Sequence, residues 1–314
     1  TLHFSFSIED AGTHRLRPVA ADGDVVAAAT RLSREIDPGA RPFSTSQVAA
    51  VEAWARRDFA RAVELDPNFG SAWVAWAETL MSVPGQAVEI ADRGLKQGGL
   101  QSPLDRAELG LLAARLHGDS AAVIRATDQL VSLRGKDAAF LQTIAAQESE
   151  ARRFERSVRF YRELLKVDPE NGSLYNLLGY AQFFAGDLAG SRASLERYGK
   201  TEGQQANAVD SEGEVLFMAG KFPDAERYFL RAHEASPAML QGGGLLKAAY
   251  AHWLGGDLPG ADAQFEKYLR FRGQVVDLQG VWRRSVWEYS TGRAESAVAR
   301  LKMVTGPTAA VAQS

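Results

Sequence analysis

The stretch from Val209 to Pro237, VDSEGEVLFMAGKFPDAERYFLRAHEASP, constrains the fold more than any other part of this chain. Its apolar residues recur at helical spacing in two blocks, and Gly220 separates the blocks. Pro223 stands where the second block begins, a position at which a helix tolerates the missing N–H. The stretch therefore predicts two amphipathic helices joined by a tight turn. The second helix has a small-large-small face that needs a neighbouring hairpin to pack against, formed by Ala225, Phe229 and Ala232.

The same pattern recurs along the chain in steps of 34 residues, with two slips of two residues each. With Ala206 as position 1, position 15 is glycine in five units, at Gly118, Gly186, Gly220, Gly256 and Gly292. The repeat predicts eight units, which span residues 36–69, 70–103, 104–137, 138–171, 172–205, 206–239, 242–275 and 278–311. An array of this kind is one body in which each unit packs on its neighbours, so the length of 314 residues does not imply two ordinary domains.

This period and these positions resemble the tetratricopeptide repeat family, bacterial members included. The family pattern has Trp or an apolar residue at 4, a small residue at 8, Gly at 15, Ala at 20, an aromatic at 24, Ala at 27 and Pro at 32. The resemblance covers residues 36–311 and is weakest in the first two units, where Ala50 replaces the glycine and Arg93 the aromatic. It implies an all-α fold, a right-handed superhelical solenoid of helix-turn-helix repeats. In the two weak units we expect merged or shortened helices.

Residues 1–35 follow a different pattern. Leu2, Phe4, Phe6 and Ile8 alternate with polar residues, which predicts a half-buried strand. A turn at residues 10–13 leads to a second predicted strand over residues 15–19, and a helix is expected from Val25 to Ile36, ended by residues 37–39. This β-hairpin and helix resemble the tail of a preceding α/β domain. Because the chain begins with threonine, we expect a piece of something longer.

Two further helices are predicted from their start and stop signals. One long helix is expected from Val48 to Leu65, closed by Asp66-Pro67. Ser102-Pro103 is a start signal for a helix that continues through His117.

Composition excludes several classes of function. The net charge is −3 and the isoelectric point is near 6.0, so the chain has no basic excess for nucleic acid. No apolar run is long enough to span a bilayer, which predicts a soluble chain without membrane insertion. The chain has no cysteine, which removes thiolate metal sites and thiol nucleophiles. Both the cytoplasm and the periplasm fit this composition, so the sequence leaves the compartment open.

Motifs that carry chemistry are not found. The five histidines are scattered over different units, and the sequence has no nucleophile elbow, Walker loop or dinucleotide fingerprint. The run Gly242-Gly243-Gly244 falls at a slip between units, which favours a turn over a phosphate cradle. Asp119, Asp187 and Asp257 stand at position 16, where an aspartate caps the second helix. We therefore expect no catalytic residue, metal or cofactor, and a protein that is not an enzyme.

The family resemblance implies that the first helix of each unit lines a concave surface. On those positions the C-terminal half of the chain is aromatic, and aromatic residues dominate interaction hot spots. The residues predicted to contact a partner are Asn176, Tyr180, Phe184, Asp210, Glu214, Phe217, Lys247, Tyr250, Trp253, Trp282 and Arg283. An alternative stays open for position 12, where Phe183, Phe217 and Trp253 could instead pack against the adjacent helix. Lys247 and Arg283 share position 6, but the Asn at position 9 that completes a carboxylate clamp in part of the family is absent.

The sequence thus predicts a non-catalytic scaffold that binds a peptide or partner protein in a concave groove. The alternative is a sensory, regulatory or oligomerisation segment of a larger bacterial signalling protein, acting by intramolecular contact or self-association. Neither the partner nor the pathway can be read from the sequence.

Overall fold

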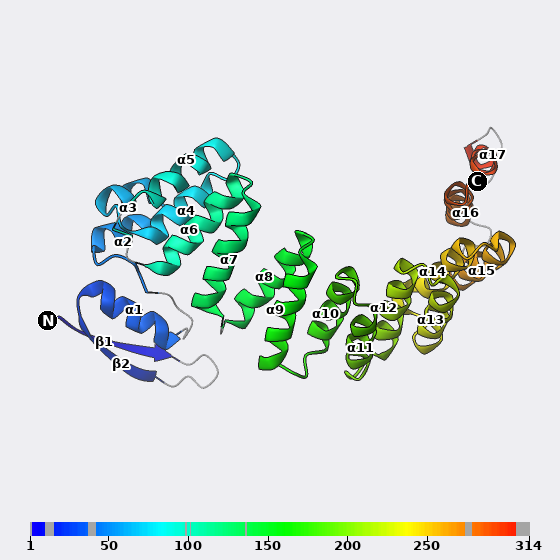
Figure 1. Cartoon of the computed structure of the whole chain (residues 1–314), viewed down its shortest axis with the longest axis horizontal. Coiled ribbons are helices and arrows are strands. Elements are labelled where there is room, and N and C mark those ends of the chain that lie inside the picture. The colour runs from blue at the N-terminus through cyan, green and yellow to red at the C-terminus, as the bar shows by residue number, and fades with distance from the viewer. Residues whose placement is uncertain are drawn as a thin grey trace. The chain divides into compact units, whose positions relative to one another are not determined.

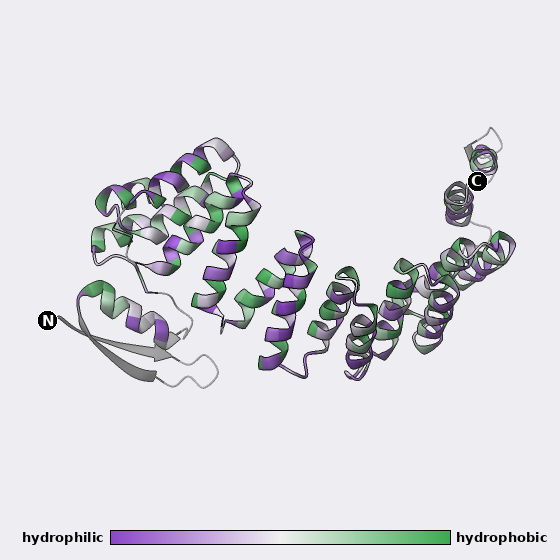
Figure 2. Cartoon of the chain, in the orientation of Figure 1, coloured by the Kyte–Doolittle hydropathy of each residue, from purple (hydrophilic) through white to green (hydrophobic). Residues whose placement is uncertain are grey.

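The computed structural model of the chain describes residues 2–9, 16–36, 42–97, 99–100, 102–135, 137–273 and 278–305. The chain divides into two compact units, Thr1–Leu141 and Gln142–Ser314, and each is described by itself (Figure 1). Hydrophilic and hydrophobic residues alternate around most helices, as amphipathic packing requires (Figure 2). The expected turn at residues 10–13, the helix stop at 37–39 and the end of the last repeat, 306–311, lie outside the described residues.

Two strands and a helix begin the chain. Strands β1 (Leu2–Glu9) and β2 (Leu16–Gly23) pair antiparallel, with Leu2 opposite Gly23. Helix α1 (Val25–Ile36) contacts both strands, and the Asp24 carboxylate accepts a hydrogen bond of 2.8 Å from the N–H of Ala27 in its first turn. Helix α1 has the predicted bounds, whereas β2 extends beyond the predicted residues 15–19. The origin of this segment as the tail of a preceding α/β domain stays a prediction.

Three helical hairpins follow in the first unit. They are α2 (Val48–Ala55) with α3 (Phe59–Leu65), α4 (Gly70–Thr79) with α5 (Pro84–Leu95), and α6 (Pro103–Leu116) with α7 (Ser120–Arg134). Buried Phe69, Trp73 and Leu109 belong to one core shared by α2 to α6. Helix α6 begins as predicted, because the Ser102 hydroxyl accepts a hydrogen bond from the N–H of Asp105.

The single helix predicted from Val48 to Leu65 is wrong. Arg57 has a left-handed backbone with φ of 63°, which ends α2, and Asp58 then caps α3 by accepting a hydrogen bond of 3.1 Å from the N–H of Arg61. A left-handed residue in a turn is usually glycine, so an arginine at this position gives no sequence signal that the helix ends. Helices α3 and α4 are only 7 and 10 residues long, which agrees with the expected shortening in the weak units.

The second unit continues the hairpins. Helix α8 (Ala138–Glu150) crosses the division between the units. The helices that follow, with one 3₁₀ turn, are α9 (Phe154–Val167), α10 (Gly172–Phe184), α11 (Leu188–Gly199), α12 (Gln205–Met218), α13 (Phe222–Ala235), η1 (Met239–Gln241), α14 (Gly243–Leu254), α15 (Leu258–Phe271), α16 (Leu278–Ser290) and α17 (Ala294–Thr305). Helices α10 to α15 contact their neighbours along the chain in sequence.

The repeat is visible in the backbone conformation of the turns. A residue with positive φ follows the first helix of each hairpin from α6 onward, in the order Gly118, Arg152, Gly186, Gly220, Gly256 and Gly292. Successive members are 34 residues apart up to Gly220 and 36 apart after it. Asp119, Asp187 and Asp257 each accept a hydrogen bond from the N–H three residues later, which confirms the predicted caps. The unit boundaries themselves stay a prediction.

Packing explains the small and large positions of the repeat. A side-chain carbon at Gly213 would lie 2.7 Å from the ring of Phe229, and one at Gly179 would lie 2.8 Å from Leu195. The glycine therefore makes room for the large residue of its own hairpin. Phe229 and Ala225 form a core cluster with Ala248 and Ala251 of α14, the next hairpin. The prediction that this face packs against a neighbour is thus confirmed.

Candidate functional site

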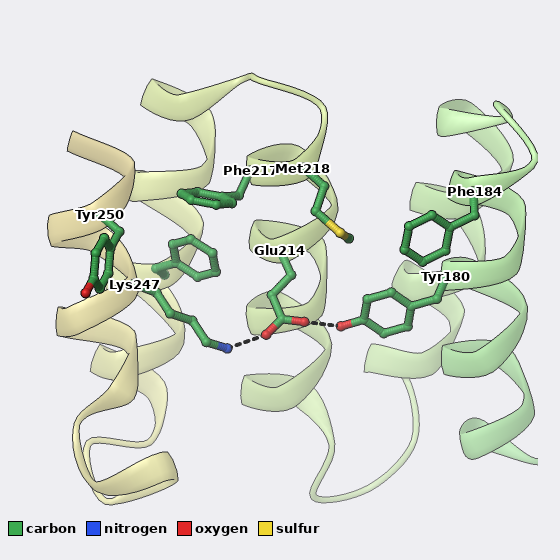
Figure 3. A pocket seen from close by; sticks show the side chains of 8 residues that line it. Tyr180, Phe184, Glu214, Phe217, Met218, Lys247 and Tyr250 are labelled. Carbon is green, nitrogen blue, oxygen red and sulfur yellow. Dashed lines mark hydrogen bonds and ion pairs between the residues drawn. The ribbon is translucent and has the colours of Figure 1, made fainter. Parts of the chain in front are cut away.

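A cavity of ≈ 630 Å³ opens on the first helices of three successive hairpins, α10, α12 and α14. Its wall is formed by Tyr180, Phe184, Glu214, Phe217, Met218, Phe229, Lys247 and Tyr250. The volume lies within the range of about 300–1,000 Å³ that ligand sites occupy. In the view of Figure 3, Phe184, Phe217 and Met218 lie above the linked polar groups of Tyr180, Glu214 and Lys247. A mostly apolar wall with a few converging polar groups is typical of a binding site.

Charged and hydroxyl groups form one network across the three helices. The Lys247 ammonium donates to Asp210 Oδ2 and to Glu214 Oε1, both at 2.5 Å. The Tyr180 hydroxyl donates to Glu214 Oε2 at 2.5 Å (Figure 3). Each helix contributes one member or more, so the network ties three hairpins together at the floor of the cavity.

Burial and partners set the charges in this network. Burial raises the pKa of Tyr180, and its hydrogen bond to Glu214 raises that pKa further, so the hydroxyl stays protonated at neutral pH. Burial also raises the pKa of Asp210, while Lys247 opposes that rise. For Lys247, burial lowers the pKa, but the hydrogen bonds to Asp210 and Glu214 outweigh burial and the pKa is raised overall. The lysine therefore stays charged.

Most of the predicted contact residues meet at this cavity. Tyr180, Phe184, Glu214, Phe217, Lys247 and Tyr250 line it. Asp210 is buried and joins the network through Lys247. Asn176, on α10, is half-buried and does not line the cavity. Their role in binding a partner stays a prediction.

The three remaining predicted residues lie outside the cavity lining. Trp253 packs edge-on against Tyr250 and Trp287, with ring centroids 6.3 and 6.5 Å apart. Trp282 is 57% exposed on α16, and the Arg283 guanidinium lies 6.0 Å from its ring centroid. Trp253 therefore has the contacts expected if position 12 packs against an adjacent helix. Phe217 both lines the cavity and contacts Phe222 and Phe229.

Two residues of the wall were not among the predicted contacts. Met218 stands at position 13, the position of Phe184 in the preceding repeat; the family resemblance puts it on the inward face, although it was left out of the predicted contacts. Phe229 was assigned a purely structural role, but its ring is both buried in the core and part of the wall. Its double role depends on how neighbouring hairpins pack, which the repeat pattern does not contain.

Exposed apolar residues extend beyond the cavity on the same helix positions. Leu254 of α14 and Trp282, Val286 and Tyr289 of α16 are all exposed. The three residues of α16 follow helical spacing, so they share one face of that helix. Exposed apolar side chains that share one helix face in this way are typical of an interaction surface.

His252 lies at a separate charged contact near the turn between α14 and α15. Its Nδ1 is 2.8 Å from Glu226 Oε2, and its Nε2 is 3.0 Å from Asp257 Oδ2. The hydrogen bonds to Asp257 and Glu226 raise the pKa of His252 above its ordinary value. A protonated His252 donates to both carboxylates and so links α13, α14 and the start of α15.

This contact predicts a pH dependence of stability. Because the pKa of His252 is raised in the folded state, its stabilising effect is complete below the unfolded pKa of about 6.5 and is lost as pH rises through the higher folded pKa. The wild type should therefore lose unfolding free energy relative to the variant His252→Gln over that window. Urea unfolding at a series of pH values measures the difference. An identical pH profile for the two proteins would contradict the prediction.

Within the described part of the chain, no group of three or more His, Asp or Glu side chains is placed to hold a metal ion. None of the helices that the structure describes is long and apolar enough to cross a membrane.

The repeated hairpins, with their left-handed turns and capping aspartates, have the fold of tetratricopeptide-type helix-turn-helix repeats. No protein-family model and no curated relative matches the sequence.

Several solved structures are similar to parts of the chain. A crystal structure of MamA protein covers 55% of this chain and 93% of its own, at 16% identity and a TM-score of 0.41. The C-terminal part of a TPR repeat-containing protein from Cytophaga hutchinsonii covers 74% and 96%, at 13% identity and a TM-score of 0.49. MamA from Desulfovibrio magneticus RS-1, from residue 41 to the end, covers 52% and 93%, at 14% identity and a TM-score of 0.38. The class assignment rests on the chain's own hairpins.

Proposed function

We propose that this protein is a non-catalytic scaffold whose cavity on α10, α12 and α14 binds a segment of a partner protein. The observation that carries this proposal is an apolar cavity of ≈ 630 Å³ with an ordered polar network at its floor. Partly buried hydrogen bonds hold that network in place, so little ordering of its side chains is needed on binding.

The surroundings of the cavity favour a peptide segment over a small molecule. Phe184 and Met218 at its wall are 47% and 43% exposed, and exposed Leu254 and Trp282 continue the apolar character on neighbouring helices. A segment that fills the cavity with one side chain could cover these residues with the next. Interfaces commonly place such an anchor in a pocket and surround it with weaker contacts.

The proposal predicts that Met218→Gln weakens peptide binding by roughly tenfold, because it puts an unpaired amide into the apolar wall. Peptides are first selected on the wild-type chain from a phage-displayed library of random dodecapeptides. The affinity of a selected peptide for each protein is then measured by isothermal titration calorimetry. Glutamine has nearly the length and helix propensity of methionine, so folding should be little affected.

The matched control is Met303→Gln, which makes the same change in α17 at a residue outside the cavity lining that is 76% exposed. It should leave the affinity unchanged. If no peptide is selected by the wild type, or if both variants bind equally well, the proposed function is wrong.

The right-handed superhelical winding, and the alternative role as a regulatory or oligomerisation segment that self-associates, stay predictions. Static light scattering of the whole chain tests self-association directly.

A further inference from the structure

The polar network beside the cavity, which includes buried Asp210 behind the lining, contains more acid than base. Asp210 and Glu214 supply two carboxylates, Lys247 supplies one ammonium, and the Tyr180 hydroxyl is neutral. With both carboxylates ionised, these four groups sum to one negative charge. The charge lies against the aromatic wall, where the local dielectric is low and an opposite charge is attracted more strongly than in water.

The two carboxylates differ in what a ligand can reach. Asp210 is only 3% exposed. Its Oδ2 accepts a hydrogen bond from Lys247, while its Oδ1 has no hydrogen-bond partner among the described residues. Glu214 lines the cavity, and about a third of its side chain (36%) is exposed. Each oxygen of an ionised carboxylate can accept more than one hydrogen bond, so Glu214 can accept a further donor beside Tyr180 and Lys247.

The same charge disfavours acidic ligands. An acidic side chain or a terminal carboxylate in the cavity would lie near the excess negative charge, and Lys247, the cation of the described cavity lining, already binds two carboxylates. Like charges brought together in an interface select against the wrong partner. The cavity is thus complementary to a ligand with an apolar part and a positive charge.

On the basis of the proposed function, we propose that the bound segment carries an aromatic or long aliphatic anchor with a lysine or arginine within two residues of it. The anchor occupies the wall formed by Phe184, Phe217 and Met218. The basic group donates hydrogen bonds to Glu214 at the floor. In an extended segment, residues two apart point to the same side, so both groups can enter one cavity.

The test is the sequence preference of peptides selected from the random library on the complete chain. On the wild type, Lys and Arg should be enriched several-fold within two residues of the apolar anchor. On Glu214→Gln this enrichment should disappear while the apolar preference remains, because the amide keeps the shape and one accepting oxygen but removes the charge. Circular dichroism of the variant establishes that it is folded.

The matched control is Glu163→Gln, a change at an exposed glutamate of α9 that pairs with exposed Lys166 at 2.6 Å. It should keep the basic preference. A synthetic peptide in which the selected lysine is replaced by norleucine should bind the wild type roughly fivefold more weakly, the effect of about 1 kcal/mol.

The outcomes separate the inference from the proposed function. Selection of apolar peptides with no basic preference, or with an acidic one, overturns the inference and leaves the scaffold function intact. A basic preference that persists in Glu214→Gln also overturns it. If no peptide is selected at all, the proposed function fails, and the inference fails with it.

Discussion

Replacing Trp287 with alanine is expected to destabilise the C-terminal hairpin by about 3–5 kcal/mol, the usual effect of truncating a buried tryptophan. Trp287 is only 3% exposed, and its ring stacks on Phe265 with centroids 4.8 Å apart and planes within 6°. Its indole N–H donates to Asp262 Oδ1 at 2.6 Å. The substitution would leave both a cavity and a carboxylate without this donor.

The consequence should be local, because each hairpin of a repeat array packs mainly on its neighbours. Hydrogen exchange should become faster in α16 and α17 and change little in α10 to α12. Trp282→Ala is the matched control, since it removes the same side chain from an exposed site on the same helix and should stay within about 0.5 kcal/mol. Equal effects of the two substitutions would contradict this account of the core.

The second large effect is expected for Glu148→Gln in α8. Glu148 is 1% exposed, and its carboxylate accepts hydrogen bonds from Arg153 at 2.5 Å and from Arg156 at 3.0 Å. The amide would remove the negative charge that faces two partly buried guanidinium groups. Removing one partner of a buried ion pair destabilises by about 3–5 kcal/mol, and the partial exposure of both arginines favours the lower end.

Chemical unfolding of the wild type and the variant, followed by far-ultraviolet circular dichroism, measures this effect. The control is Glu163→Gln, whose exposed pair with Lys166 is worth about 0–1 kcal/mol. A loss for Glu148→Gln no greater than for the control would show that the buried cluster does not hold α8 to α9.

The repeat could be predicted from the sequence because glycines marked its turns. Gly220 and Gly256 both have the left-handed backbone that the pattern implies, with φ of 72° and 101°. Arg57 and Arg152 adopt the same backbone with φ of 63° and 58°. Arginine carries no such signal, and this is why the break between α2 and α3 was missed while the regular hairpins were found.

The candidate site was predictable as a set of residues but not as a set of contacts. The inward positions that the family resemblance implies put Tyr180, Glu214 and Lys247 on equivalent faces of three first helices. Their hydrogen bonds depend on the side-chain reach between neighbouring hairpins, which a repeat pattern does not specify. The same limit explains why Trp287 was not recognised as core and why the packing alternative for Trp253 stayed open.

The most direct test of the central claim is to map where a selected peptide binds. A peptide chosen by the wild-type chain is synthesised with a photoreactive benzophenone side chain at its apolar anchor, cross-linked to the protein by light, and the attachment site is identified by mass spectrometry. The account predicts attachment to the cavity residues of α10, α12 or α14, with Phe184 and Met218 foremost. Attachment confined to α16 and α17, or to helices of the first unit, would contradict it.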